Sequence, residues 1–232
     1  MIPVRAVLFD AGGTLIHLDG ERICAAVGLA FQGPAFRRAE TSATADARAW
    51  IARHPRSSDS ERLPVFFDAL LSALQIAEGQ ARQDAAARLW REHRNANLWS
   101  RSADGAEETL SALRGRGYRL GVVSNADGRV RRLLEHVGLL VYLEIVVDSA
   151  EVGIEKPDPA IFLAATERLG LAPAESAYVG DIYEIDIQGA RAAGLEPILI
   201  GSCPAPEPVR RVPDLPSLLE FLPGPPDVRR ET

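Results

Sequence analysis

This chain of 232 residues contains little cysteine, no long apolar run and no excess of basic residues. Its two cysteines, Cys24 and Cys203, lie far apart without metal-ligand spacing, which favours free thiols in a reducing compartment. No apolar run approaches the roughly 20 residues of a membrane-spanning helix. The formal net charge of −6 argues against nucleic-acid binding, which normally requires a basic face.

The start of the chain also argues against a targeting segment. An apolar run begins within a few residues of Met1, which leaves no room for a signal peptide. We therefore expect a cytoplasmic protein that contacts neither membranes nor nucleic acids. The length allows one substantial domain with an insertion, or two small domains, and nothing in the sequence indicates the oligomeric state.

From Arg119 onward, short apolar segments alternate with helical patterns. One helix is well marked, because Pro159 lies near its start and Gly170 just past its end. Strands are expected at 120–123, 143–147, 176–179 and 197–200, and helices at 159–169, at 185–193 and from a cap at Asp127 to His136. This alternation predicts an α/β fold with a Rossmann-like parallel sheet covered on both faces.

The segment from about Gly20 to Trp99 has a different character. It is rich in Ala and Arg, with apolar residues at helical spacing. Proline and glycine divide it into about four expected helices, at Pro34, Pro55, Pro64 and Gly79. A helical block between the first strand and the rest of an α/β domain is an insertion. The sequence thus predicts a core of residues 1–17 and 100–232 and a helical cap of residues 18–99.

The most informative stretch is the apolar run 4–9, which ends in Asp10 and is followed by Gly12-Gly13. A strand that ends in an acid and a glycine turn places a carboxylate at the carboxyl edge of the sheet, where open α/β sheets bind ligands. The glycines also allow backbone N–H groups to approach an anion closely. Asp10 is therefore expected to be a nucleophile, a metal ligand, or both.

Three further loops carry polar residues close to strand ends, and a parallel sheet would bring all four loops to one edge. They contain Ser124-Asn125, Lys156-Pro157, and Gly180-Asp181 with Asp186 five residues on. Clustered carboxylates repel one another unless a cation neutralises them, and oxygen ligands suit Mg²⁺. The chemistry that fits is phosphoryl transfer, with Asp10 forming an aspartyl-phosphate.

These four motifs, in this order, resemble those of the haloacid dehalogenase (HAD) superfamily of hydrolases. Its first motif is similar to residues 9–15, its second to 123–125, its third to Lys156-Pro157, and its fourth to 179–181 with Asp186. Each motif is weak alone, whereas all four in order are a specific signal. The resemblance covers the α/β part of the chain, and the helical insertion resembles the C1 type of cap.

The resemblance implies a set of metal-site roles. Asp10 would be the nucleophile and a magnesium ligand. The backbone carbonyl of Gly12 and the carboxylate of Asp181 would be further ligands. Asp186 would hold the metal's waters or orient Lys156.

The resemblance also implies how a small phosphorylated substrate would be bound. Ser124 and Lys156 would contact its phosphate, together with the backbone N–H groups that follow Asp10, beginning at Ala11. Thr14 would brace this loop, and Asn125 would add a contact at the pocket wall.

One position departs from the pattern of the family's phosphatases. They usually carry Asp two residues after the nucleophile, where it acts as general acid and base, and here that position is Gly12. A substitute acid could come from His17, Asp19 or Glu21, or the substrate could need none. The favoured function is a slow Mg²⁺-dependent phosphomonoester hydrolase. A weakly active or non-catalytic binder of phosphate ligands comes second and a 2-haloacid dehalogenase third, because dehalogenases usually have an aromatic residue at that position and need no metal.

Overall fold

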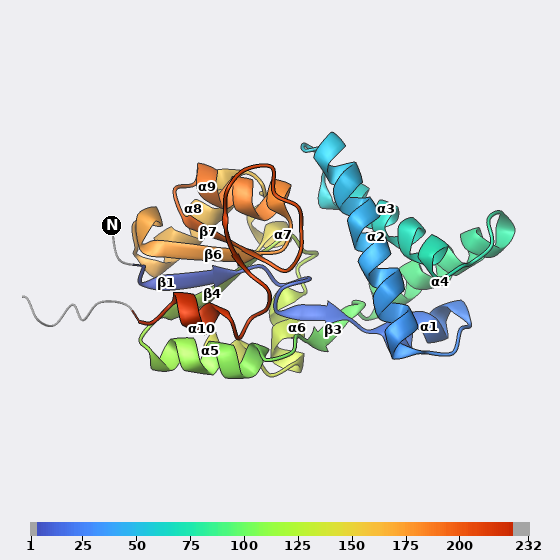
Figure 1. Ribbon diagram of the computed structural model, residues 1–232, viewed down its shortest axis with the longest axis horizontal. Coiled ribbons are helices and arrows are strands. Elements are labelled where there is room, and N and C mark those ends of the chain that lie inside the picture. Colours follow the sequence, from blue (N-terminus) through green and yellow to red (C-terminus); the bar gives the residue numbers. More distant parts are fainter. Residues whose placement is uncertain (1–3, 225–232) are drawn as a thin grey trace, which may run out of the picture. The chain divides into compact units, whose positions relative to one another are not determined.

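The computed structural model describes residues 4–224 of the chain. These residues fall into two compact units, one formed by residues 4–17 and 102–224 and the other by Leu18–Arg101. The chain passes between them twice, through strands β2 (Ile16–Leu18) and β3 (Trp99–Ser102), which pair with each other. The first unit is an α/β domain and carries every motif singled out above (Figure 1).

The α/β unit is built on a six-stranded sheet with the order β5-β4-β1-β6-β7-β8, in which each neighbouring pair is parallel. The strands are β1 (Ala6–Phe9), β4 (Arg119–Ser124), β5 (Ile145–Asp148), β6 (Ser176–Gly180), β7 (Glu196–Ile200) and β8 (Arg210–Val212). Because the strands are parallel, their carboxyl ends meet at one edge. Every residue of β1 is fully buried, as expected for a central strand covered on both faces.

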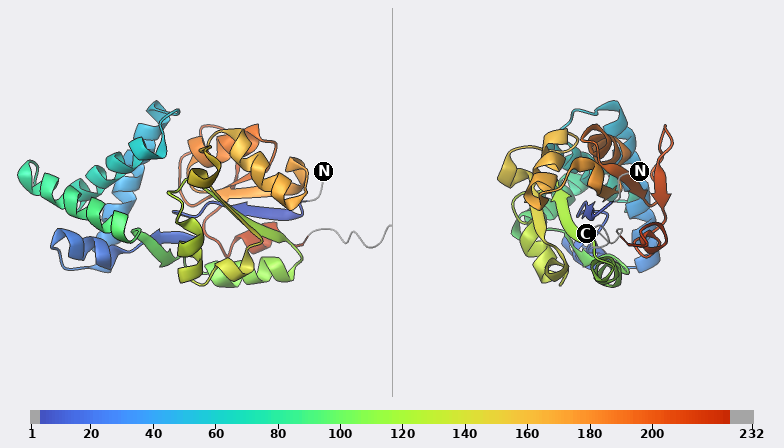
Figure 2. Two further views of the ribbon diagram at one scale, coloured as in Figure 1. Left: turned by 180° about the vertical axis from the view of Figure 1, so that it is seen from behind. Right: turned by 90° about the vertical axis from the view of Figure 1, so that its left-hand side faces the viewer.

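Helices cover both faces of this sheet (Figures 1 and 2). Helices α8 (Pro159–Leu169) and α9 (Gln188–Ala192) lie on one face, and α5 (Ala106–Gly115) and α10 (Leu218–Phe221) on the other. Ile161 and Phe162 of α8 pack with Leu8 and Tyr178 of the sheet in one apolar core. The position of α8 thereby fixes the loop in front of it, which carries Lys156.

The ends of α8 follow directly from its sequence. The Asp158 side chain accepts a hydrogen bond from the backbone N–H of Ala160 at 2.9 Å, which satisfies one of the free donors of the first turn. Pro159 occupies the first turn, where a missing N–H costs nothing. Gly170 ends the helix in the left-handed conformation, with φ of 61°.

The second unit consists of four helices, α1 (Gly20–Val27), α2 (Gly33–Arg53), α3 (Asp59–Ala73) and α4 (Gln80–Asn95). They share an apolar core of their own, to which Phe36, Phe67 and Leu89 contribute. The ring of Phe67 meets Trp90 edge-on, with 5.1 Å between centroids. None of the described helices combines the length and the apolar character that crossing a bilayer requires.

The expected α/β fold with a helical insertion is confirmed, and several local predictions need correction. Pro64 does not end a helix but lies inside α3, because the buried stripe with Phe67 and Leu70 outweighs one lost backbone hydrogen bond. Asp127 does not cap α6 (Val130–His136), since its carboxylate pairs with Arg129. The short strands β2, β3 and β8 were not anticipated, because segments of three or four residues carry little periodic signal.

Candidate active site

Asp10 lies at the carboxyl edge of the sheet, directly after β1. Its backbone N–H donates to the carbonyl of Val179 at 2.8 Å, which ties it to β6. The parallel register sets β1 between β4 and β6, so Ser124 and Gly180 end the strands on either side of Asp10. Sequence segments more than 100 residues apart therefore meet around one carboxylate, which is only 6% exposed.

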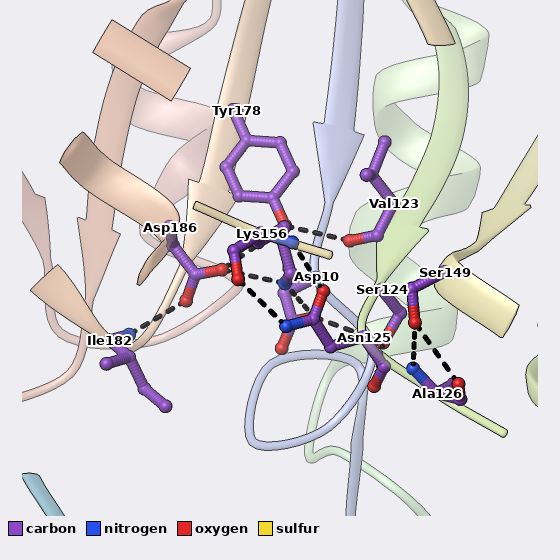
Figure 3. A network of polar contacts seen from close by, with 10 residues as sticks. All are labelled: Asp10, Val123, Ser124, Asn125, Ala126, Ser149, Lys156, Tyr178, Ile182 and Asp186. Atoms are coloured by element: carbon purple, nitrogen blue, oxygen red, sulfur yellow. Dashed lines mark hydrogen bonds and ion pairs between the residues drawn. The ribbon is translucent and has the colours of Figure 1, made fainter. Parts of the chain in front are cut away.

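The ammonium of Lys156 binds this carboxylate (Figure 3). Its Nζ donates to Asp10 Oδ1 at 2.6 Å, to Asp186 Oδ1 at 2.8 Å and to the hydroxyl of Tyr178 at 2.9 Å. An ammonium has three N–H donors, so each has a protein acceptor. Lys156 is 3% exposed and is held as a fixed buried charge.

The two oxygens of Asp10 have different surroundings. Ser124 Oγ donates to Asp10 Oδ1 at 3.2 Å, and Lys156 donates to the same oxygen. Among residues 4–224, no hydrogen-bond donor is found on Oδ2. One oxygen is therefore anchored, while the other can attack an electrophile or bind a cation.

The electrostatics of this cluster favour an additional positive charge. Burial raises the pKa of Asp10 to about 7; the charge of Lys156 opposes this rise, and repulsion by Asp186 and Asp181 adds to it. Burial would lower the pKa of Lys156, but attraction to Asp10 and Asp186 outweighs burial and raises it above its ordinary value. Three carboxylates around one ammonium leave surplus negative charge that a divalent cation would neutralise.

The donor atoms fit Mg²⁺. One carboxylate oxygen from each of Asp10, Asp181 and Asp186 lies within 4.8 Å of the others, and such all-oxygen sets suit a hard cation. Gly13 makes room for Asp181, because a Cβ there would lie 2.9 Å from Asp181 Oδ2. Both oxygens of Asp186 already accept protein hydrogen bonds, from Lys156 Nζ at 2.8 Å and from the N–H of Ile182 at 2.9 Å, which fits a supporting role.

Asn125 braces the loop that carries Lys156. Its Oδ1 accepts from the backbone N–H of Lys156 at 2.7 Å, and its Nδ2 donates to the carbonyl of the same residue at 3.0 Å. Both polar ends of the amide are thus used within the protein. This arrangement indicates that Asn125 holds Lys156 in place, a more specific role than the expected contact at a pocket wall.

Two buried residues of the sheet, Asp148 and Tyr178, were missed by sequence reasoning. Asp148, the last residue of β5, accepts from the N–H groups of Val130 at 3.3 Å and Ala150 at 3.0 Å, so it caps both α6 and α7 (Ser149–Val152). An acid just after the predicted strand 143–147 was an available signal for this role. Tyr178 gave no such signal, because an aromatic residue inside an apolar strand is typical of ordinary core packing.

The remaining predicted residues lie in or beyond the loop that follows Asp10. The carbonyl of Ala11 accepts from the N–H groups of Leu15 at 2.9 Å and Ile16 at 2.8 Å, which closes a tight turn around Gly12. Thr14 is buried in this turn, and its hydroxyl has no hydrogen-bond partner within the described chain.

Of the three substitute acids considered, only His17 belongs to the α/β unit, where it is exposed on β2. Asp19 caps α1 by accepting from the N–H of Arg22 at 3.1 Å, and Glu21 is exposed in the first turn of the same helix. Both belong to the helical unit. A proton-transfer role for any of the three stays a prediction.

Comparison with known proteins identifies the class to which this fold and this site belong. The sequence profile of the haloacid dehalogenase-like hydrolases matches residues 4–194. The chain therefore belongs to the haloacid dehalogenase-like hydrolase family, and the predicted family is confirmed.

Individual relatives match only in part. The haloacid dehalogenase-like hydrolase domain-containing protein 3 of Mus musculus is 39% identical over 165 residues, which cover 68% of this chain and 65% of the relative. A phosphoserine phosphatase of Thermus thermophilus is 38% identical over 152 residues, covering 65% of this chain and 59% of that protein. The matched segments span less than two thirds of these relatives' own lengths.

Solved structures resemble nearly the whole chain. A dehalogenase in complex with an intermediate is 25% identical, with a TM-score of 0.65, covering 96% of this chain and 98% of its own. The protein YfnB from Bacillus subtilis, bound to magnesium, is 20% identical, with a TM-score of 0.68, covering 95% of this chain and 99% of its own. The second likeness shows a shared fold alone.

Proposed function

We propose that this protein is a Mg²⁺-dependent phosphomonoester hydrolase that acts through an aspartyl-phosphate on Asp10. The observation that carries the proposal is the asymmetric setting of the Asp10 carboxylate. Oδ1 is held by Lys156 and Ser124, while oxygens of Asp181 and Asp186 lie within 4.8 Å of an Asp10 oxygen. A carboxylate held in this way is a positioned nucleophile beside an oxygen-rich cation site.

The reaction balances in two steps. An oxygen of Asp10 attacks the substrate phosphorus, and the bond to the leaving oxygen breaks with its electron pair on that oxygen. Water then attacks the phosphorus of the aspartyl-phosphate and the bond between phosphorus and Asp10 breaks, which releases inorganic phosphate and restores the Asp10 carboxylate. The proton that this water loses replaces the one that the leaving oxygen takes up from solvent. Lys156 and Ser124 hold the attacking group in place throughout. Mg²⁺, when bound by Asp10, Asp181 and the carbonyl of Gly12, would neutralise charge on the phosphate.

Two other functions are distinguished by specific features. A 2-haloacid dehalogenase releases halide and needs no cation, so it would leave the cluster of Asp181 and Asp186 without a use; the cluster favours phosphate chemistry. A non-catalytic binder of phosphate ligands would need the same cluster but no proton transfer, and Gly12 is the feature that supports it. The helical unit Leu18–Arg101 is proposed as the cap that selects the substrate.

Gly12→Asp tests the proposed chemistry. The natural protein is expected to hydrolyse alkyl phosphates slowly, because Gly12 cannot protonate a poor leaving group. The hydrolysis of acetyl phosphate and p-nitrophenyl phosphate should be slowed less, because their leaving groups depend less on protonation. The substitution should raise alkyl-phosphate turnover by about 10²-fold, within the usual range for general acid–base catalysis, and acetyl-phosphate turnover much less. Steady-state rates with saturating Mg²⁺ measure both effects.

Gly12→Asn is the matched control, since it adds nearly the same shape without a transferable proton. Equal rates for alkyl and aryl phosphates in the natural protein, with no gain from Gly12→Asp, would show that another group supplies the proton. His17, Asp19 and Glu21 would then be substituted in turn. A protein inert on every phosphate before and after the substitution would instead favour the binding function.

Asp181→Ala tests the proposed cation site. Calorimetric titration with MgCl₂ should show affinity weaker by at least about tenfold, because even loss of an outer partner of a metal ligand typically costs 10- to 100-fold. Asp84→Ala on the surface of α4 removes the same charge and should leave the affinity unchanged. Equal Mg²⁺ affinity in Asp181→Ala and the natural protein would move the metal site elsewhere.

A further inference from the structure

The hydroxyl of Tyr178 is a buried polar group that the reaction above does not use. Tyr178 is fully buried in β6, and its hydroxyl lies 2.9 Å from Lys156 Nζ and 2.8 Å from the carbonyl oxygen of Val123. Because an ammonium can only donate, the hydroxyl accepts from Lys156. Its single proton goes to the nearer of two acceptors, the carbonyl oxygen of Val123 at 2.8 Å, since Asp186 Oδ1 lies at 3.4 Å. The hydroxyl therefore connects the backbone of β4 to the charged group beside Asp10 (Figure 3).

The ring of Tyr178 is held in place by packing. Phe162 of α8 packs edge-on against it, with 4.8 Å between centroids and 82° between planes, and both rings belong to the apolar core that the sheet shares with α8. Lysine has four rotatable bonds and loses substantial conformational entropy when fixed. The hydroxyl is thus an acceptor that packing holds on a buried strand, whereas the position of the Lys156 ammonium depends on its hydrogen bonds.

The hydroxyl of Tyr178 is the third acceptor of the Lys156 ammonium. Asp10 Oδ1 and Asp186 Oδ1 each take one N–H of Lys156. Without the hydroxyl of Tyr178, the third N–H would have no partner, and the ammonium could move toward Asp186 and away from Asp10. Any such movement would weaken the bond that holds the attacking carboxylate.

We propose that Tyr178 is a positioning residue, whose hydroxyl fixes the Lys156 ammonium against Oδ1 of Asp10. This inference rests on the proposed function, because turnover at Asp10 is its first readout. Tyr178 acts through Lys156 and does not itself touch the substrate.

Tyr178→Phe removes the hydroxyl and keeps the ring. With p-nitrophenyl phosphate and Mg²⁺, kcat is expected to fall about 10- to 100-fold, the range that corresponds to loss of one hydrogen bond to a charged group. KM should stay within about threefold. Tyr118→Phe is the matched control, because this tyrosine is also buried but is not one of the three acceptors of Lys156, and its kcat should equal that of the natural protein.

A double variant separates positioning from general structural damage. In a Lys156→Ala background, Tyr178→Phe should change kcat by less than about twofold, because a residue that acts only through Lys156 has nothing left to position. An equal fall in both backgrounds, or an unchanged kcat in Tyr178→Phe alone, would overturn the proposal. If Tyr178→Phe does not fold, 3-fluorotyrosine at position 178 weakens the acceptor without removing it, and a smaller fall in kcat is expected; an unchanged kcat would again overturn the proposal.

An inactive natural protein would defeat the proposed function but would not decide the role of Tyr178. The midpoint of thermal unfolding then provides the readout. Tyr178→Phe should lower it in the natural background and lower it clearly less in Lys156→Met, where the ammonium is gone. Equal shifts in the two backgrounds would overturn the inference.

Discussion

Asp10→Asn is expected to abolish turnover and, at the same time, to stabilise the metal-free protein. An amide cannot form the aspartyl-phosphate, so kcat should fall by about 10⁴-fold or more, as is typical when a nucleophile is removed. Stability should rise because burial and the neighbouring Asp186 and Asp181 disfavour the charged form of Asp10. The Asn oxygen can still accept from Lys156, so the local geometry is kept.

The raised pKa of Asp10 also predicts how the stabilisation by Asp10→Asn depends on pH. In the folded protein the pKa of Asp10 is raised from its ordinary value of 3.8 to about 7. Between these values the folded chain holds a proton that the unfolded chain has released. The contribution of Asp10 to the free energy of unfolding therefore falls as pH rises from about 4 to about 7 and stays low above that. The gain from Asp10→Asn should thus be largest near pH 8, of the order of a few kcal/mol, because one pKa unit corresponds to about 1.4 kcal/mol.

Urea unfolding with a chelator present, at pH 5 and at pH 8, measures this effect. Asp148→Asn is the matched control, since Asp148 is also a buried strand-end acid, but its two oxygens cap two helices. That substitution should destabilise by about 1 kcal/mol. If Asp10→Asn were no more stable than the natural protein at pH 8, the surroundings of Asp10 would not disfavour its charged form. Full turnover in this variant would refute the covalent mechanism.

Local sequence patterns were sufficient to predict the strands and the helix that carry the site residues. The apolar run before Asp10 and the strand before Ser124 each end in a polar residue, and the helix after Lys156 has a proline start and a glycine stop. These are local signals with direct physical causes, and a parallel sheet brings such strand ends to one edge. The meeting of Asp10, Ser124 and Lys156 therefore followed from pattern and topology alone.

What the sequence could not show depends on tertiary packing. Nothing in the strand 176–180 indicates that Tyr178 directs its hydroxyl toward Lys156, because this depends on how α8 packs on the sheet. In the same way, the sequence places Asn125 beside Ser124 but does not reveal that its amide closes on the backbone of Lys156. Such contacts join segments more than 20 residues apart and leave no periodic trace.

Lys156→Met is expected to have the largest effect on stability. Asp10 and Asp186 both direct an oxygen at the Lys156 ammonium, at 2.6 and 2.8 Å, and all three side chains are buried. Removing one partner of a buried ion pair typically costs about 3–5 kcal/mol, because the remaining charge lacks compensation. Met fills a similar volume, so the loss should reflect charge and not a cavity. Turnover should also fall steeply, because Asp10 loses its main anchor.

Changes of pH, charge and Mg²⁺ test whether Lys156→Met is destabilised by the loss of charge compensation. In a chelator the loss of unfolding free energy should be greater at pH 8 than at pH 5, since at lower pH the carboxylates can take up protons. Adding Asp10→Asn should recover part of the loss, because one of the two uncompensated charges disappears. Mg²⁺ should also recover part of it in Lys156→Met, as any cation bound only by the folded state must. A loss below about 1 kcal/mol at pH 8 would contradict this account, because it would mean that the carboxylates do not depend on Lys156 for their charge balance.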